Sequence, residues 1–434
     1  MKWRRAANTA APMVAPAAIS LRTASPNGCA KVTVIVHSVP RNVAAPRSRK
    51  NPTKLSPLRA GVNSADSHYL EPPDLWTSNL PKELAELVPR SEKDPDGEWE
   101  TVHVDGQAFR RKLPTSAAVK FVEDSMKPQG ARDPVARLAD LDKEGVWAEV
   151  MFASLGMWNA CFRTRELLRQ ALRVNNDWTR ETFMKASPRF VVTAQIPTLV
   201  VEDAIAELQR CAGLGFLVAA LPTRPHPSQE DYNHKLWDPF WSAAEEAGMV
   251  VSFHIGSDPV DPTRQRYAGL VYRGPGGAVL NYAESTFSGQ RVAMKMVASG
   301  ALDRHPNLKV LVAEGGASWI PFIGDRMREG YRQHHAAVRP KLSRDPKEIL
   351  YDQVYTSFQH DESAVASYTA MGYDKVCFGS DYPHMEGTFG HTQQTLAELF
   401  ENTSESVRYR VTQGAFLELF PGVPPVPADT SVIA

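Results

Sequence analysis

Polar residues that can bind a metal or move a proton stand at the ends of apolar runs in this 434-residue chain. Asp66 and His68 close the first such run, His254 closes the run 250–254, and Asp381 follows the run 375–380. Asp66 and His68 are two residues apart, so an extended backbone directs both side chains to the same side. Two carboxylates and two imidazoles without a thiolate suit a borderline divalent cation. We therefore expect Asp66, His68, His254 and Asp381 to bind one Zn²⁺ or Mn²⁺ ion.

Each of these residues also has an ordinary structural explanation. Asp66 could accept hydrogen bonds in a turn, and His68 could cap a strand. His254 follows apolar or small residues, and a lone histidine there is more often hydrogen-bonded in the core than bound to a metal. The shared placement of all four residues favours the metal site over these separate explanations.

The elements that must position these residues follow a regular alternation of short β-rich apolar runs and amphipathic stretches. Eight runs have the composition of strands: the run that ends at 66–68, then 146–153, 190–196, 216–221, 250–255, 309–314, 354–358 and 375–380. Helical patterns include 164–184, 201–211, 235–247, 283–301 and 363–371. This alternation predicts an α/β fold, a TIM (β/α)8 barrel, in which chemistry occurs at the carboxyl ends of the strands.

Two segments interrupt this alternation, and we expect them to be loop insertions over one end of the barrel. The first, 77–114, follows strand one and contains a hairpin-like stretch around Asp105 and Gly106. The second, 257–278, follows strand five and is rich in Gly, Pro, Arg and Tyr. Either insertion could build a lid.

The amino-terminal sixty residues differ in composition from the rest of the chain. Residues 1–60 contain eleven Lys or Arg and no Asp or Glu, whereas residues 61–434 contain 38 basic and 49 acidic residues. An acid-free basic leader resembles an organelle transit peptide, while its prolines equally favour a disordered extension or a start codon placed too far upstream. We expect the barrel domain to span 61–421 and residues 422–434 to form a flexible tail.

Composition excludes several classes of protein. No stretch approaches the roughly 18 consecutive apolar residues of a membrane helix, and an acidic body argues against a nucleic-acid enzyme. The four cysteines are far apart and predict a reducing compartment. We expect a cytoplasmic protein, or an imported one if residues 1–60 are a transit peptide. A homodimer is one option, because barrels of this size often pair through helices, but no sequence feature fixes the oligomeric state.

Several motifs carry a family resemblance. They are Asp66-Ser67-His68, Glu246-x-Gly248-x-Val250-x-x-x-His254, Glu314-Gly315-Gly316-x-x-Trp319 and Gly379-Ser380-Asp381-Tyr382-Pro383-His384. Over residues 66–421 the chain resembles the amidohydrolase-related (amidohydrolase 2) family, which includes aminocarboxymuconate-semialdehyde decarboxylase. The resemblance implies a mononuclear zinc or manganese site with ligands from a strand-one H-x-H or E-x-H pair, a strand-five His and a strand-eight Asp.

The chain departs from that pattern at two strand ends. Asp66 takes the place of the first residue of the strand-one pair. Glu314 stands at the end of strand six, where many members of the family carry a His for proton transfer. The run 216–221 contains no Lys of the kind that bridges two metals in some binuclear barrels, which favours a single metal.

One divalent cation at such a site supports two chemistries, and both need Asp381. In hydrolysis, Asp381 takes a proton from a metal-bound water, whose pKa falls towards about 7, and the hydroxide attacks a lactone, amide or ester carbonyl. In non-oxidative decarboxylation, the metal orients a substrate oxygen or carboxylate while an acid protonates the carbon that loses CO₂. We favour decarboxylation of a small unsaturated or aromatic carboxylic acid over hydrolysis of a carbonyl compound. A catalytically silent barrel used as a binding protein is a third hypothesis.

Further residues near the expected strand ends complete the predicted site. Aromatic side chains there could stack on a planar substrate or simply plug the barrel mouth: Trp158, Trp319, Phe358 and Tyr382. Arg224 could pair with a substrate carboxylate or be a surface charge. His360 and His384 follow strands seven and eight and could carry a second proton or support a ligand carboxylate. For Glu314 we favour proton transfer over a fifth metal ligand or a structural anchor for its loop.

Overall fold

Parallel strands form the centre of the computed structural model, which describes residues 61–112, 120, 123–124, 126–156, 162–257 and 275–427. The strands of the central sheet are β1 Val62–Ser64, β2 His68–Tyr69, β6 Val146–Ala153, β7 Phe190–Gln195, β8 Val218–Leu221, β9 Val250–His254, β10 Val310–Ala313, β11 Val354–Phe358 and β12 Val376–Phe378. The extension 1–60, Trp158, most of the second insertion and the end of the tail lie outside the described residues.

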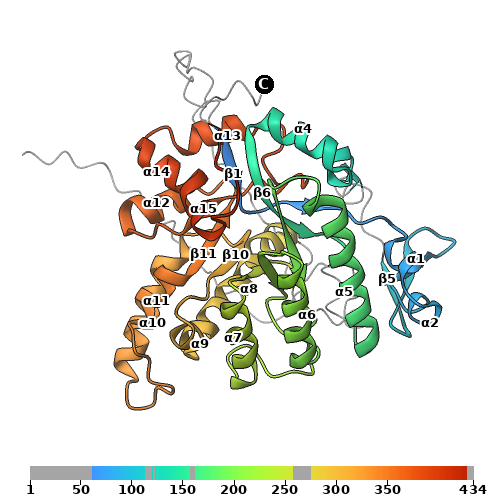
Figure 1. The fold of residues 1–434 in the computed structure, drawn as a ribbon, viewed down its shortest axis with the longest axis horizontal. Coiled ribbons are helices and arrows are strands. Elements are labelled where there is room, and N and C mark those ends of the chain that lie inside the picture. Colours follow the sequence, from blue (N-terminus) through green and yellow to red (C-terminus); the bar gives the residue numbers. More distant parts are fainter. Residues whose placement is uncertain are drawn as a thin grey trace, which may run out of the picture. The chain divides into compact units, whose positions relative to one another are not determined.

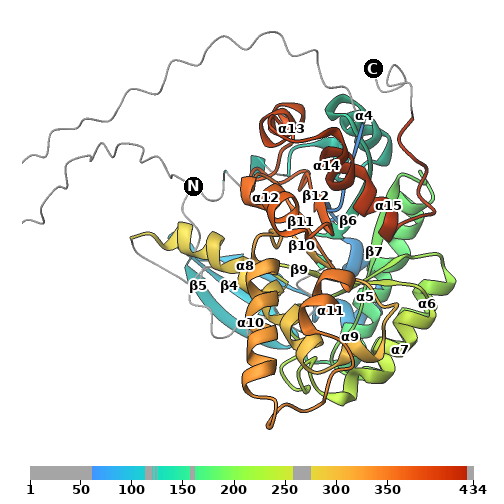
Figure 2. The same cartoon turned by 90° about the vertical axis from the view of Figure 1, so that its left-hand side faces the viewer.

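The sheet closes into a barrel (Figures 1 and 2). Its neighbours run in the order β1, β6, β7, β8, β9, β10, β11 and β12, and β2 continues β1 along β6. At the seam, the Ala65 N–H donates to the Phe378 carbonyl at 2.8 Å, and Ser67 forms a parallel bridge with Tyr382. The structure confirms the predicted TIM barrel, with its first strand split around residues 65–67.

Helices surround the barrel wall, and the structure extends the set expected from sequence. They are α4 Pro134–Glu144, α5 Arg165–Thr179, α6 Val201–Gly213, α7 Asp238–Glu246, α8 Gly277–Ala298, α9 Ala301–Arg304, α10 Trp319–Gln333, α11 Pro346–Gln353, α12 Glu362–Met371, α13 Thr392–Leu399, α14 Glu405–Tyr409 and α15 Ala415–Leu419. A π-helical turn, Arg180–Met184, continues α5. Within the described parts of the chain, no helix is both long and apolar enough to cross a membrane.

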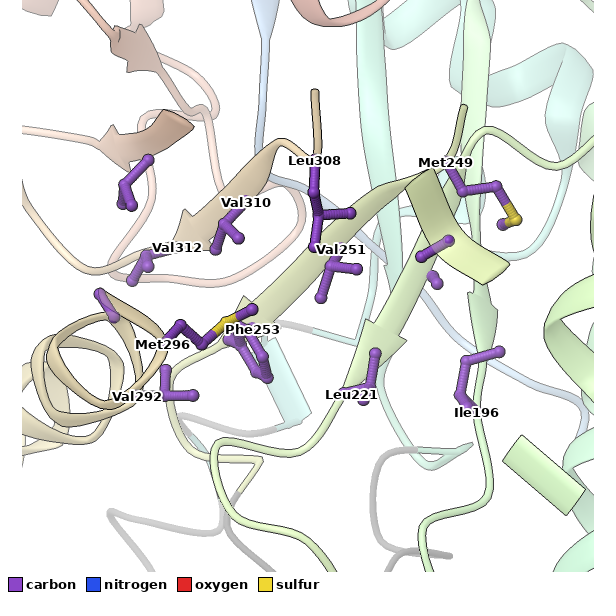
Figure 3. Packing of buried hydrophobic residues seen from close by; sticks show 14 of the residues in the cluster. Ile196, Leu221, Met249, Val251, Phe253, Val292, Met296, Leu308, Val310 and Val312 are labelled. Carbon is purple, nitrogen blue, oxygen red and sulfur yellow. The ribbon is translucent and has the colours of Figure 1, made fainter. Parts of the chain in front are cut away.

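Two layers of side chains pack on the two faces of the barrel wall, because successive residues of a strand point in opposite directions. Phe253 of β9 faces outward and packs with Met296 of α8 in the layer between sheet and helices (Figure 3). Val250 of β9 and Leu311 of β10 belong to the separate inner layer. His254 has the same parity as Val250, so the alternation carries its imidazole into the barrel interior.

The first insertion forms two short helices, α1 Leu75–Asn79 and α2 Lys82–Ala85, and a small antiparallel sheet of β3 Arg90–Lys93, β4 Trp99–Val104 and β5 Gln107–Lys112. The expected hairpin is present: β4 and β5 join at Asp105 and Gly106, whose φ angles of 49° and 72° suit a tight turn. Val104 belongs to the same buried apolar cluster as Leu167 of α5. The insertion is therefore anchored to a barrel helix.

Candidate metal centre

The barrel seam brings the two ends of the sheet together at the site. The Asp381 N–H donates to the Asp66 carbonyl at 2.9 Å, and the His68 N–H donates to the Tyr382 carbonyl at 2.5 Å. Gly379 permits this approach, because a Cβ atom there would lie 2.8 Å from the Asp66 Cβ. Main-chain hydrogen bonds thus place Asp66 and His68 beside Asp381, which follows the last strand of the barrel.

The four expected ligands converge in the barrel interior. The Nε2 atoms of His68 and His254 are 3.0 Å apart. Asp66 Oδ1 lies 3.2 Å from His254 Nε2, and Asp381 Oδ1 lies 3.5 Å from His68 Nε2. All four residues are buried, with at most 4% of their surface exposed. One atom from each of Asp66, His68 and His254 lies within 4.8 Å of the others, a spacing that allows a shared cation.

Main-chain carbonyls fix the orientation of both imidazoles. His68 Nδ1 is 3.3 Å from the Ala153 carbonyl, and His254 Nδ1 is 2.7 Å from the Ile255 carbonyl. Because a carbonyl only accepts, Nδ1 carries the proton in each ring, and the Nε2 of a neutral ring presents a lone pair. Two lone pairs that face each other at 3.0 Å repel unless a proton or a metal cation lies between them.

Asp381 shows the same need for a cation. Its carboxylate is buried, yet neither oxygen has a hydrogen-bond donor among the described residues. Buried carboxylate oxygens normally have such partners. Together with the opposed imidazoles, these orphaned oxygens show that the residues present fit a divalent metal ion.

Burial and like charges shift the pKa values of the cluster. Burial, together with repulsion from Asp66, raises the pKa of Asp381 well above its usual value. Burial and repulsion from Asp381 do the same to the pKa of Glu314. Burial and neighbouring imidazoles lower the pKa of His68. Burial alone would lower the pKa of His254, but the negative charges of Asp66 and Glu314 outweigh it and raise that pKa to about 9.

Metal binding is expected to displace a proton from His254. With a pKa of about 9, the ring is protonated at pH 7 in metal-free protein and must become neutral before Nε2 can coordinate. The affinity for Mn²⁺ should rise about tenfold or more per pH unit from roughly pH 6 to pH 9. Calorimetry in two buffers with different ionisation enthalpies counts the released protons. A pH-independent affinity over this range would contradict the assignment of His254 as a ligand.

Glu314 lies at the rim of the cluster. Its Oε2 is 3.8 Å from His254 Nε2, and its side chain is 13% exposed. The Glu314 N–H donates to Ser357 Oγ at 2.8 Å. Trp319 Nε1 donates to the carbonyls of residues 315 and 316 at 3.0 and 2.9 Å. Trp319, a candidate either for stacking on substrate or for plugging the barrel mouth, thus anchors the loop that carries Glu314.

Glu314 and Asp381 also share an uncommon backbone conformation. Their φ angles are 56° and 53°, in the left-handed region that non-glycine residues seldom adopt. Such a conformation costs on the order of 1–3 kcal/mol and persists where surrounding contacts enforce it, often at functional sites. Both acids follow barrel strands directly, so this strain concentrates at the site.

The structure brings His384 to the cluster but leaves His360 outside it. The ring of His384 stacks on His68 with centroids 4.2 Å apart. Its Nδ1 is 2.9 Å from Asp381 Oδ1, although the two groups are not aligned as a hydrogen bond, and its side chain is 30% exposed. His360 is exposed, and its Nε2 lies 3.2 Å from the Glu386 carbonyl. His384 therefore links the buried carboxylate to the surface.

The side chains of three candidate substrate-binding residues are directed away from the cluster or exposed. The Tyr382 ring packs under the Arg137 guanidinium at 4.6 Å, and its hydroxyl donates to Asp140 at 2.6 Å. Phe358 belongs to the layer between the sheet and the helices, because the inward positions of β11 are 355 and 357. Arg224 is exposed in the loop after β8. The expectation for Trp158 falls outside the described residues.

Arg137 holds the main chain of the candidate ligand His68, a role that sequence analysis did not identify. It is fully buried, forms an ion pair with the equally buried Glu149, and donates to the His68 carbonyl at 2.7 Å. A charged hydrogen bond to the main chain of a candidate ligand holds that strand segment in place. Removing one member of such a buried pair leaves an uncompensated charge.

Phe152 is a further site residue that sequence analysis missed. Its buried ring stands 4.8 Å from the His254 ring, centroid to centroid. A small, mostly apolar cavity reaches from His254 along this side of the barrel and is lined by Phe152, Leu172, Gln195, Ile196, Leu221 and Ser257. The alternation of β6, in which Ala148, Val150 and Phe152 share the inner face, was the signal that could have found it.

Comparison with known proteins shows the family to which this chain belongs. A family model described as Amidohydrolase matches residues 123–420, a range that includes His254, Glu314 and Asp381 but begins after Asp66 and His68. Among curated relatives, 2-amino-3-carboxymuconate-6-semialdehyde decarboxylase of Dictyostelium discoideum is 25% identical over 285 residues, which cover 63% of this chain and 74% of that protein. Gamma-resorcylate decarboxylase of Rhizobium sp. is 24% identical over 260 residues, covering 57% and 76%.

Solved structures share the fold. An amidohydrolase from Mycobacterium avium subsp. paratuberculosis K-10 superposes with a TM-score of 0.67 and 20% identity, covering 83% of this chain and 99% of that chain. A dihydroxybenzoic acid decarboxylase from Polaromonas sp. JS666, with bound manganese and the inhibitor 2-nitroresorcinol, gives a TM-score of 0.53 at 19% identity, covering 83% and 97%.

Proposed function

This chain belongs to the amidohydrolase family, and from that premise we propose that it is a metal-dependent carboxy-lyase that removes CO₂ from a small aromatic or unsaturated carboxylic acid without oxidation. The observation that carries the proposal is the convergence of Asp66, His68, His254 and Asp381, with Glu314 at 3.8 Å from His254. The names of the curated relatives, which are decarboxylases of muconate and resorcylate acids, support the choice of reaction.

We infer that Asp66, His68, His254 and Asp381 hold one divalent cation, Mn²⁺ or Zn²⁺. Imidazole and carboxylate donors suit either ion, and manganese in the Polaromonas decarboxylase supports the first. When bound, the cation supplies the positive charge that attracts and orients an anionic acid. The carboxylates of the site would repel such a substrate, so its binding depends on the cation.

The chain's own residues supply an apolar surface and a proton. Phe152 and the residues that line the small cavity next to His254 offer an apolar surface against which the edge of a planar ring can pack. As the bond to the carboxyl carbon breaks, its electron pair stays on the substrate carbon, and Glu314 delivers a proton there. The raised pKa of Glu314, caused by burial and by Asp381, favours the protonated acid that this step needs. His384, whose Nδ1 lies 2.9 Å from Asp381 and whose side chain is 30% exposed, carries protons between the cluster and the surface.

Parallel assays of two products test the proposal. Mn²⁺- and Zn²⁺-loaded protein is offered a panel of aromatic acids, unsaturated acids and lactones, and CO₂ release and ring opening are measured together. We expect metal-dependent CO₂ release from at least one planar acid and loss of that release after chelation. Ring opening without CO₂ release, or a stoichiometric metal with neither product, would reject the carboxy-lyase.

A metal-dependent hydrolase of a lactone, amide or ester is the second candidate. Asp381 favours it, because a buried carboxylate that has no hydrogen-bond donor in the described part of the chain is available to accept a proton from water. The solved amidohydrolase from Mycobacterium also has this barrel, although the likeness concerns the fold alone. The lactone arm of the same panel decides between the two reactions.

A further inference from the structure

We propose that Glu314, Asp381 and Glu386 form a second cation site, selective for a hard divalent ion such as Mn²⁺ or Mg²⁺, beside the centre described above. One carboxylate oxygen of each residue lies within 4.8 Å of the other two. The sequence predicted a single metal, and Glu386 was not among its candidate residues. The second site shares only Asp381 with the first group of ligands.

The loop after β12 fixes Glu386 over Asp381 through main-chain contacts. The Thr388 N–H donates to the Ser380 carbonyl at 2.8 Å, so the loop returns to the strand end that it left. At Gly387 a side chain would collide with the Ser380 carbonyl, which shows how closely the two backbone segments approach. The position of Glu386 beside the acid is therefore built into the loop.

The second carboxylate oxygen of Asp381 is a further sign of a ligand, beyond what the first cation accounts for. Asp381 is completely buried, and among the residues that the structure describes neither carboxylate oxygen has a hydrogen-bond donor. Its Oδ1 is the atom near His68, at 3.5 Å. Coordination of the first cation through Oδ1 still leaves Oδ2 without a partner, and a carboxylate can bridge two cations with its two oxygens.

The negative charge of the ionised cluster also favours binding of more than one cation. Asp66, Glu314, Asp381 and Glu386 place four carboxyl groups in these contacting groups. When all four are ionised, as cation binding to Glu314 requires, a single divalent ion balances half of their charge. In the part of the chain that the structure describes, the cations paired with Asp66, Glu314 and Asp381 are imidazoles rather than Lys or Arg. Uncompensated buried charge is costly, so a bound cation stabilises this arrangement.

Ligand chemistry separates the two sites. The first combines imidazole and carboxylate donors, which hold borderline transition metals, whereas the second offers only carboxylate oxygens, which suit Mg²⁺, Ca²⁺ and Mn²⁺. Glu314 and Glu386 are also partly exposed, in contrast to the buried first ligands. We therefore expect the second ion to bind at least tenfold more weakly than the first.

The consequence for activity rests on the proposed function. A cation bound to the Glu314 oxygens occupies the carboxylate that delivers the proton, so filling the second site stops turnover. Activity should rise as the first ion binds and fall again at higher metal concentration. Binding itself does not depend on which reaction the protein catalyses.

Metal binding to the full chain tests the site directly. Protein stripped with a chelator is titrated with Mn²⁺ by equilibrium dialysis and by electron paramagnetic resonance. We expect two equivalents in two affinity classes, with a spin-coupled signal because the ions share Asp381. Glu386→Gln should lose the weaker equivalent and keep the tighter one. The control Glu362→Gln, an exposed carboxylate at the start of α12, should keep both.

A single equivalent up to millimolar Mn²⁺, or a second equivalent that survives both Glu386→Gln and Glu314→Gln, would overturn the second site. Thermal unfolding of each variant establishes that it is folded. A chain that binds two ions but releases no CO₂ would reject the proposed function and keep the second site. A chain that releases CO₂ but binds only one ion would reject the second site and keep the proposed function.

Discussion

Replacing Asp381 with asparagine is expected to lower kcat by about 10³-fold or more and to stabilise the metal-free protein. Asparagine has nearly the same shape but removes one ligand charge, while Asp66, His68 and His254 remain in place. The orphaned oxygens of the buried Asp381 carboxylate are the observation behind both effects. We therefore expect the Asp381 carboxylate to lower the stability of the metal-free protein while it supports metal binding and turnover.

The stability effect has a defined sign. Burial and Asp66 raise the pKa of Asp381 in the folded chain above its usual value of 3.8, so folded protein binds this proton more tightly than unfolded protein does. Metal-free protein therefore loses stability as the pH rises from about 4 through the raised pKa. At pH 7 an uncharged amide avoids this loss. We expect the free energy of unfolding of the metal-free variant to increase by about 1–3 kcal/mol.

Thermal unfolding with and without Mn²⁺, combined with steady-state kinetics, measures both effects of Asp381→Asn. The stabilisation produced by added metal should shrink in the variant, because the metal binds it more weakly. Asp361→Asn is the matched control, since Asp361 is an exposed acid outside the metal-ligand groups. If Asp381→Asn kept a tenth of the wild-type kcat together with full metal affinity, Asp381 would not be a ligand.

The candidate ligands could be predicted from sequence because a closed parallel barrel brings the carboxyl ends of all its strands to one rim. His254 shows why the rule works. As the last residue of β9 it lies at the carboxyl-terminal rim of the barrel, and its parity with Val250 directs its side chain inward. Asp66 and His68 followed the same logic, although the interruption of their strand was not foreseen. The two-residue alternation of a strand and the position of its end are enough to predict where such side chains lie.

The remaining site residues depend on information that the sequence does not carry. Both faces of β11 contain polar and aromatic residues, so its pattern could not show that Phe358 points outward. Tyr382 turns toward Arg137, a residue from a helix between the first two barrel strands. Glu386 belongs to a loop without periodicity, and only the return of that loop at Gly387 places it near Asp381. Loop geometry and long-range partners therefore set the limit of prediction.

Replacing Glu314 with glutamine is expected to lower kcat by about 10²- to 10⁴-fold while the first metal equivalent stays bound. Glutamine keeps the shape of the side chain but has no acidic proton to give to the substrate carbon. Asp66, His68, His254 and Asp381 are unchanged, so KM should move only a few-fold. Kinetics on Mn²⁺-loaded protein, with the metal content measured on the same sample, separate loss of the proton from loss of the metal.

The pH profile distinguishes proton transfer by Glu314 from a purely structural role. Burial and Asp381 raise its pKa, so the acid stays protonated to a higher pH than an ordinary glutamate and loses its proton as the pH rises further. The wild-type kcat should therefore fall on the alkaline side, and Glu314→Gln should lack that limb. Glu314→His, which installs another proton donor beside His254, should restore part of the rate. If Glu314→Gln kept the wild-type profile at reduced rate, the carboxylate would only position its loop, and the proton would have to come from another group such as His384.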